Sequence, residues 1–176
     1  MDDRIPATAE EAKALANPVR MRILRLCGEQ ELTNKQLAQR LDRDPSTILH
    51  HIRQLVAAGF LEPMTPRPGP TGALEKPYRS TNRSWLRDLT GAQSPELLAD
   101  ANLAMLEAFR EELVEAGPAS IVSSSRFVFH LDPDERDALM ARLQAVLDEY
   151  VRSDDERKAA GKPAHGGVLF VHTQPD

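Results

Sequence analysis

The sequence has a single cysteine, few aromatic residues and no long apolar run. One cysteine, Cys27, excludes an intramolecular disulfide and a multi-cysteine metal site, and its place on an apolar helix stripe favours packing over redox sensing. Eight aromatic residues mark no ligand pocket. No stretch approaches the ~18 apolar residues of a membrane helix, and the acidic start lacks the apolar run of a signal peptide. These absences predict a cytoplasmic protein with no membrane partner.

The length of 176 residues fits one domain or two small ones and excludes a (β/α)₈ barrel, which needs about 250 residues. With 41% hydrophobic and 28% charged residues, the composition is that of a globular chain with a core. Arginine supplies 17 of the 22 basic residues, which suggests a GC-rich, bacterial genome.

Capping signals divide the first part of the chain into four short helices. Thr33 and Gln36 form a capping box that opens the third helix. Asp44 caps the fourth helix, predicted over residues 45–58, and Gly59 ends it in a left-handed conformation. Two short helices joined by a three-residue turn predict a helix-turn-helix.

An extended hairpin follows these helices. Residues 60–64 and 74–81 are strand candidates around a tip rich in proline and glycine, and together they predict a wing over residues 60–81. Pro77 has no backbone N–H to donate, so we expect it at an edge or a bulge of a two-stranded hairpin.

The remaining chain is predicted to alternate between helices and strands. The expected elements are a helix between Ser94 and Gly117, a strand over 126–131, a helix capped by Asp132, a linker over 152–167 and a strand over 168–172. The predicted fold class is therefore mostly α with small β (α+β), with one domain over residues 1–91 and a helix-strand-helix-strand region over residues 92–176.

Four motifs in the first half occur in a characteristic order. They are Leu15–Leu24 (LANPVRMRIL), Leu32–Thr33 leading into Gln36–Ala38, Ser46–Leu55 (STILHHIRQL) and Ala58–Glu62 (AGFLE). Over residues 9–81 the chain resembles the winged helix-turn-helix domain of ArsR-like bacterial transcription regulators. The resemblance implies a winged helix-turn-helix fold that binds DNA. The second half is similar to the dimerisation and sensing extensions of some longer members.

Side chains off the buried stripe of the fourth helix are the ones that can reach base edges in the major groove. We expect base or phosphate contacts from that helix, from the start of the helix before it and from the wing, whose cations suit the backbone or the minor groove. The predicted DNA-binding residues are Asn34, Lys35, Ser46, Thr47, His50, Arg53, Gln54, Arg67, Lys76 and Arg79. Leu49 lies beside them and either packs against the wing or contacts a thymine methyl group.

Charge is distributed unevenly along the chain. The net charge of −5 argues against a polyanionic partner, yet residues 1–91 carry 14 basic and 11 acidic residues, a net +3. Residues 92–176 carry 8 basic and 16 acidic residues, a net −8. This asymmetry is expected of a two-part regulator whose second half stays off the DNA.

An apolar ridge on the long helix of the second half suggests how two copies associate. Its members are Leu98, Met105, Phe109 and Leu113. We expect a homodimer on a pseudo-palindromic operator, with half-sites about one helical turn (~34 Å) apart. The alternative is that this ridge packs within the chain. The simplest regulator of this kind is a repressor released or engaged by an unidentified effector.

Other functions fit the sequence less well. A winged helix can serve as a protein-interaction module without operator binding. A hydrolase that uses the serines Ser123–Ser125 with His130 and Asp132 lacks a nucleophile elbow and a phosphate loop, so we expect no enzyme. We also expect no cofactor and no metal. Metal-sensing members of this family carry clustered cysteines in the helix before the fourth one, where this sequence has none, and the adjacent His50 and His51 point about 100° apart on a helix. The scattered His130, His165 and His172 show no ligand spacing.

Overall fold

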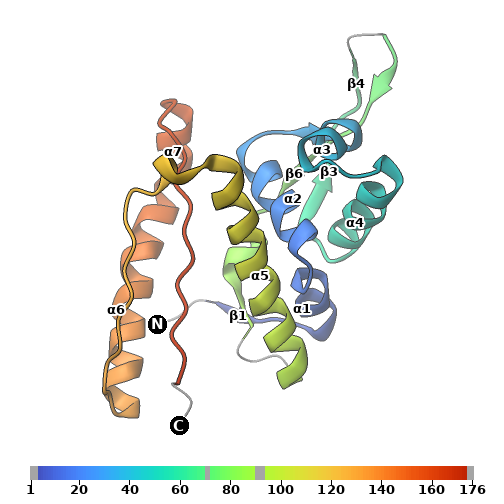
Figure 1. The fold of residues 1–176 in the computed structure, drawn as a ribbon. Coiled ribbons are helices and arrows are strands. Elements are labelled where there is room, and N and C mark those ends of the chain that lie inside the picture. Colours follow the sequence, from blue (N-terminus) through green and yellow to red (C-terminus); the bar gives the residue numbers. More distant parts are fainter. Residues whose placement is uncertain (1–3, 70–71, 90–93, 174–176) are drawn as a thin grey trace. The chain divides into compact units, whose positions relative to one another are not determined.

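The computed structural model describes residues 4–69, 72–89 and 94–173. The chain divides into two compact units, residues 3–120 and 121–176, and each is described by itself (Figure 1). The boundary predicted between residues 91 and 92 lies outside the described residues. The compact units divide later, because the helix after that boundary packs on the first unit.

The first unit is mostly helical. Its helices are α1 (Ala9–Leu15), α2 (Pro18–Glu29), α3 (Asn34–Leu41), α4 (Pro45–Ala57) and α5 (Pro95–Ala116), with short 3₁₀ turns at Arg83–Leu86 and Pro118–Ser120. The expected caps form: the Thr33 hydroxyl accepts from the Gln36 backbone N–H, and Asp44 accepts from the Ser46 N–H. Gly59 ends α4 with φ +72°, a conformation in which a Cβ is strained.

Three short strands form the sheet of this unit. They are β2 (Leu32–Thr33), β6 (Pro77–Ser80) and β3 (Leu61–Pro63), in the order β2-β6-β3, all antiparallel. β4 (Arg67–Pro68) and β5 (Leu74–Glu75) extend the wing, and β1 (Ile5–Pro6) pairs in parallel with β7 (Arg87–Asp88).

The predicted edge position of Pro77 is wrong. Pro77 is buried in the central strand, paired with Thr33, so the wing is part of a three-stranded sheet. Proline is accommodated because it is the first residue of β6, and its carbonyl accepts from the Met64 N–H at 2.9 Å.

One apolar core holds the helices and the sheet of the first unit together. Its largest fully buried side chains include Phe60, Ile23, Ile48, Ile52 and Leu55, contributed by α2, by α4 and by the segment that leads into the wing. Because α4 buries only one stripe, its opposite face stays in solvent.

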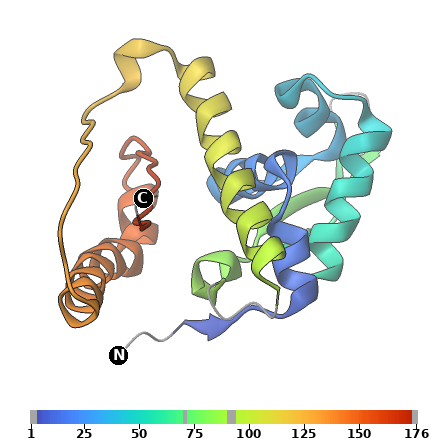
Figure 2. The same ribbon diagram turned by 60° about the horizontal axis from the view of Figure 1, so that its bottom comes forward.

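Helix α5 closes the first unit by packing across α1 and α2 (Figure 2). Its buried seam consists of Ala101, Ala104 and Ala108, which let the helices approach closely. Ion pairs border the seam: Arg25 Nε lies 2.6 Å from Glu112 Oε1.

The second unit contains α6 (Pro133–Arg152) and α7 (Asp154–Ala159). Asp132 and Glu135 form the predicted capping box of α6. α7 lies within the predicted linker, where a run of acidic residues followed by basic ones suits a helix. None of the described helices is long and apolar enough to cross a membrane.

The helix-strand-helix-strand prediction for the second half is therefore wrong in its strands. Residues 126–131 and 168–172 form no strand and have no regular secondary structure. Alternating side chains are present, including the stacked Phe127 and Phe129 rings 4.8 Å apart, but no described backbone segment hydrogen-bonds alongside either stretch. The α+β fold class itself is confirmed, with its strands confined to the first unit.

Cys27 gives a direct test of the core. The side chain is fully buried, and burial raises the pKa of its thiol to about 12. Because the thiolate is the reactive form, we expect iodoacetamide at pH 8 to leave the native protein unmodified while alkylating the urea-unfolded protein within minutes. Mass spectrometry measures the difference. Equal rates in both states would show that Cys27 is accessible.

Candidate nucleic-acid interface

The N-termini of α3 and α4 lie together. The Asn34 side-chain amide donates to the Pro45 carbonyl at 3.1 Å, which joins the first residue of α3 to the first residue of α4. Helix N-termini present free N–H groups and a partial positive charge that attract phosphate. The predicted phosphate contact Asn34 is thus occupied in holding the two helices, whereas the neighbouring Lys35 is exposed.

The outer face of α4 carries the side chains that can read DNA. Five of the predicted residues are exposed there: Ser46, Thr47, His50, Arg53 and Gln54. The Asp44 carboxylate accepts from the Ser46 hydroxyl and backbone, and these hydrogen bonds lower the pKa of Asp44. Ser46 is therefore partly committed to the helix cap.

Gln54 is held from inside the fold. Arg20 on α2 is buried and donates to the carbonyls of Lys13 (2.8 Å) and Ala14 (2.5 Å) at the end of α1. Its third bond, at 2.6 Å, goes to the Gln54 side-chain oxygen. This bond uses one of the two lone pairs of the Gln54 oxygen and restrains the side chain, which still carries the acceptor and the donor that suit adenine.

Arg20 is a positioning residue that the sequence reasoning did not single out. Its spacing from Ile23, Leu24 and Cys27 places it on the buried face of α2, and this spacing is the feature of the sequence that indicates its burial. By joining the last turn of α1 to Gln54, Arg20 fixes the orientation of α4.

His51 lies beside this network and is half-buried. Burial is the largest cause that lowers its pKa, and the positive charge of Arg20 and the nearby His50 add to it, against a hydrogen bond with Gln54. Its ring faces His50 at 5.8 Å between centroids with the planes tilted by 60°. His51 is thus half-buried against the fold, whereas the neighbouring His50 is exposed.

The cations of this face differ in whether an acid pairs with them. Arg67 at the wing tip pairs with Glu31 at 3.2 Å, and Arg79 pairs with Glu62 at 3.0 Å. Within the described chain, Lys35, Arg53 and Lys76 have no ion pair. A free cation can neutralise a phosphate without first giving up a carboxylate, so these three are the stronger candidates.

A hollow of about 410 Å³ separates α4 from the wing. It is lined by Leu49, Ile52, Arg53, Val56, Ala57, Pro63, Lys76 and Tyr78. Its lining combines an apolar floor with Arg53 and Lys76, which have no ion pair in the described chain, so α4 and the wing face one shared groove.

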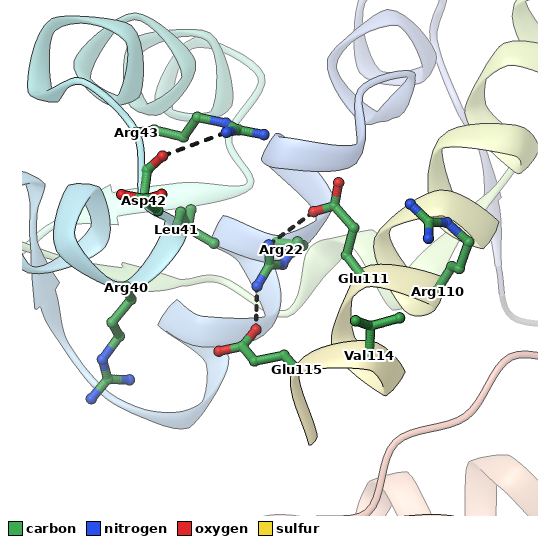
Figure 3. A pocket seen from close by; sticks show the side chains of 9 residues that line it. All are labelled: Arg22, Arg40, Leu41, Asp42, Arg43, Arg110, Glu111, Val114 and Glu115. Atoms are coloured by element: carbon green, nitrogen blue, oxygen red, sulfur yellow. Dashed lines mark hydrogen bonds and ion pairs between the residues drawn. The ribbon is translucent and has the colours of Figure 1, made fainter. Parts of the chain in front are cut away.

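A second hollow, of about 430 Å³, lies where α5 meets α2 and the turn after α3 (Figure 3). Arg22 extends from α2 and donates to Glu111 at 2.8 Å and to Glu115 one turn further along α5. These two ion pairs brace α5 against α2.

The predicted dimer residues lie beside the alanine seam of α5. All four, namely Leu98, Met105, Phe109 and Leu113, are half-buried. Further round the helix, Leu103, Leu106 and Val114 are exposed at 62%, 41% and 71%. The helix thus presents one apolar surface to its own unit and a second one outward.

No group of three metal-binding side chains occurs among the described residues. His130, His165 and His172 are each exposed. The segment 123–125 is exposed as well.

Residues 15–63 match a family model described as a helix-turn-helix domain. The match runs from the last residue of α1 to the end of β3 and includes α3 and α4 whole. The chain therefore carries a helix-turn-helix domain, and the match supports a DNA-binding role. No curated protein matches the sequence.

Several solved structures have similar chains. A chain described as a "possible transcriptional regulator" from Methanosarcina mazei Go1 is 14% identical, with 55% of this chain and 72% of that chain covered and a TM-score of 0.33. The PcaV transcriptional regulator of Streptomyces coelicolor is 16% identical (74% and 73% covered, TM-score 0.34). RV1404 of Mycobacterium tuberculosis is 18% identical (89% and 85%, TM-score 0.35). At these identities and TM-scores the likenesses carry no argument about function.

Proposed function

We propose that this chain is a sequence-specific DNA-binding transcription regulator. It reads the major groove with α4 and holds the backbone or the adjacent minor groove with the wing. The observation that carries the proposal is the outer face of α4, where the exposed, unpaired Arg53 faces the wing's unpaired Lys76 across one groove. Lys35, exposed at the N-terminus of α3, supplies a further cation for a phosphate beside it.

The distribution of charge favours this orientation. The net +3 of residues 1–91 approaches phosphate, and the net −8 of residues 92–176 is repelled by it. We infer a bacterial, cytoplasmic repressor of ArsR-like type that occludes a promoter and responds to an effector through its second half.

The regulator is proposed to act as a homodimer on a pseudo-palindrome. One reading helix makes few base contacts, whereas two helices related by a two-fold axis address half-sites about 34 Å apart. The predicted ridge Leu98, Met105, Phe109 and Leu113, widened by the exposed Leu106, is the proposed interface.

The test is in vitro selection of random duplex DNA with the full chain, followed by fluorescence anisotropy on the selected sequence from 50 to 200 mM salt. We expect an enriched palindrome and an affinity that falls steeply with salt, because each neutralised phosphate releases counterions. No enrichment, with salt-independent binding to DNA, would refute the proposal.

The second candidate is a protein-interaction module. It predicts that Lys35, Arg53 and Arg79 are dispensable and that partner binding depends little on salt. The same titration separates the two candidates, since replacing Lys35 with alanine lowers the salt slope by about 1 only if Lys35 contacts a phosphate.

The dimer has its own expected result. Replacing Leu106 with glutamate puts a charge into the proposed apolar interface, so we expect sedimentation to show a monomer where the native chain is a dimer. Leu106 is exposed in its own unit, so folding should persist. Replacing the exposed Asp100 of the same helix with asparagine is the control and should leave the dimer intact. A native chain that is monomeric at micromolar concentration yet binds its operator fully would overturn the interface.

A further inference from the structure

Leu49 is an apolar residue on the reading helix that the core does not use. Among the described residues, the half-buried apolar side chains that pack on the core are Val19, Met21, Val56, Ala58, Tyr78 and Leu89. Leu49 is half-buried without belonging to this set. It faces the open groove between α4 and the wing, one helical turn before Arg53.

The groove is too large for Leu49 to fill. Its volume is about 410 Å³, so Leu49 forms part of one wall and leaves open space towards the wing. Val56 and Tyr78 line the same groove but have their own contacts with the core. Leu49 lines the groove beside them but is not among the side chains that pack on the core.

The charges of the groove indicate its occupant. Arg53 and Lys76 line it, both are exposed, and none of its lining residues is acidic. The two cations can bind the charges of a polyanion, and the apolar wall between them can contact an apolar group on the same molecule. In the major groove of DNA the apolar group of a base edge is the C5-methyl of thymine.

We propose that Leu49 reads this methyl group, so that each half-site contains one thymine recognised by apolar contact while Arg53 and Lys76 hold the flanking strand. The proposal rests on the DNA-binding function above and adds a specificity residue to it. It also decides between the two roles that the sequence leaves open for Leu49.

The experiment replaces the thymines of the selected operator one at a time with deoxyuridine, which lacks only the methyl group. We expect the affinity of the native protein to fall about fourfold at one thymine in each half-site, the factor for one buried methylene-sized group. At the other thymines the affinity should stay unchanged.

Two variants assign the effect to Leu49. Leu49→Ala should bind the thymine and uracil operators equally, with both at the weaker level. Lys76→Ala is the matched control from the opposite wall: it should weaken both operators alike and keep the fourfold preference for thymine, because a phosphate contact carries no base information.

Each other result overturns the inference. An operator without a uracil-sensitive thymine excludes methyl recognition although DNA binding stands. A thymine preference that survives in Leu49→Ala assigns the methyl to another residue. A large fall in thermal stability for Leu49→Ala with unchanged operator binding would show that Leu49 serves in packing and does not contact the DNA. Failure of the native chain to select any DNA refutes the proposed function, and the inference falls with it.

Discussion

Replacing Arg53 with alanine is expected to weaken binding to the selected operator by about 5- to 150-fold, or about 1 to 3 kcal/mol, if its guanidinium makes a bidentate contact with guanine. Arg53 is exposed on the outer face of α4, and no acid pairs with it in the described chain. Nothing inside the fold therefore depends on it, and anisotropy with the full-length protein measures the loss directly.

Two further variants separate the modes of contact. Arg53→Lys keeps the charge and loses the planar fork, so it restores affinity if Arg53 holds a phosphate and fails to do so if Arg53 reads guanine. Arg79→Ala is the matched control, since Glu62 already pairs with that cation, and we expect a smaller loss. An unchanged footprint and affinity in Arg53→Ala would mean that α4 does not enter the groove.

The largest effect on folding is expected from Phe60→Ala. Phe60 is fully buried at the point where α4 leads into the wing, and its backbone also hydrogen-bonds to Leu55 and Thr81. Removing a buried phenyl ring leaves a cavity and costs about 3 to 5 kcal/mol of the free energy of unfolding. Urea denaturation followed by the fluorescence of Trp85, in the same unit, measures the change.

A matched control comes from the wing. Leu74 is 76% exposed, so Leu74→Ala should change the free energy of unfolding by no more than about 0.5 kcal/mol. A loss below about 1 kcal/mol in Phe60→Ala would contradict the core described above.

The helices of this fold could be predicted because their signals are local. A cap needs two residues three positions apart, and Thr33 with Gln36 or Asp132 with Glu135 meets this requirement within one turn. The left-handed end of α4 at Gly59 is equally local. Such features depend little on the rest of the chain.

The strands could be predicted less well because a strand depends on its partner. Phe127 and Phe129 alternate as a strand would, yet that stretch forms no ladder in the described chain. At Pro77 the sequence predicts an edge position, but the residue lies in the central strand of a sheet. Leu32 and Thr33, 44 or more residues earlier, pair with β6. No local pattern announces a pairing over that distance.

The candidate site shows the same limit. The exposed positions of α4 follow from its period, and Arg53 and His50 stand where the sequence predicts. The partners of Gln54 and Arg79 do not follow from any period. Arg20 and Glu62 reach them from other elements of the fold.

The alanine seam of α5 bears on the spacing between the two half-sites of an operator. The helix that offers the outward leucines is fastened to α1 and α2 through Ala101, Ala104 and Ala108, inside the unit that also holds α4. In a dimer joined through α5, the distance between the two α4 helices would therefore be fixed by the packing of α5 on its own unit. The preferred spacing between half-sites would then depend on these three small side chains. A bulkier residue at any of them would shift α5 and change which operator spacings the dimer binds.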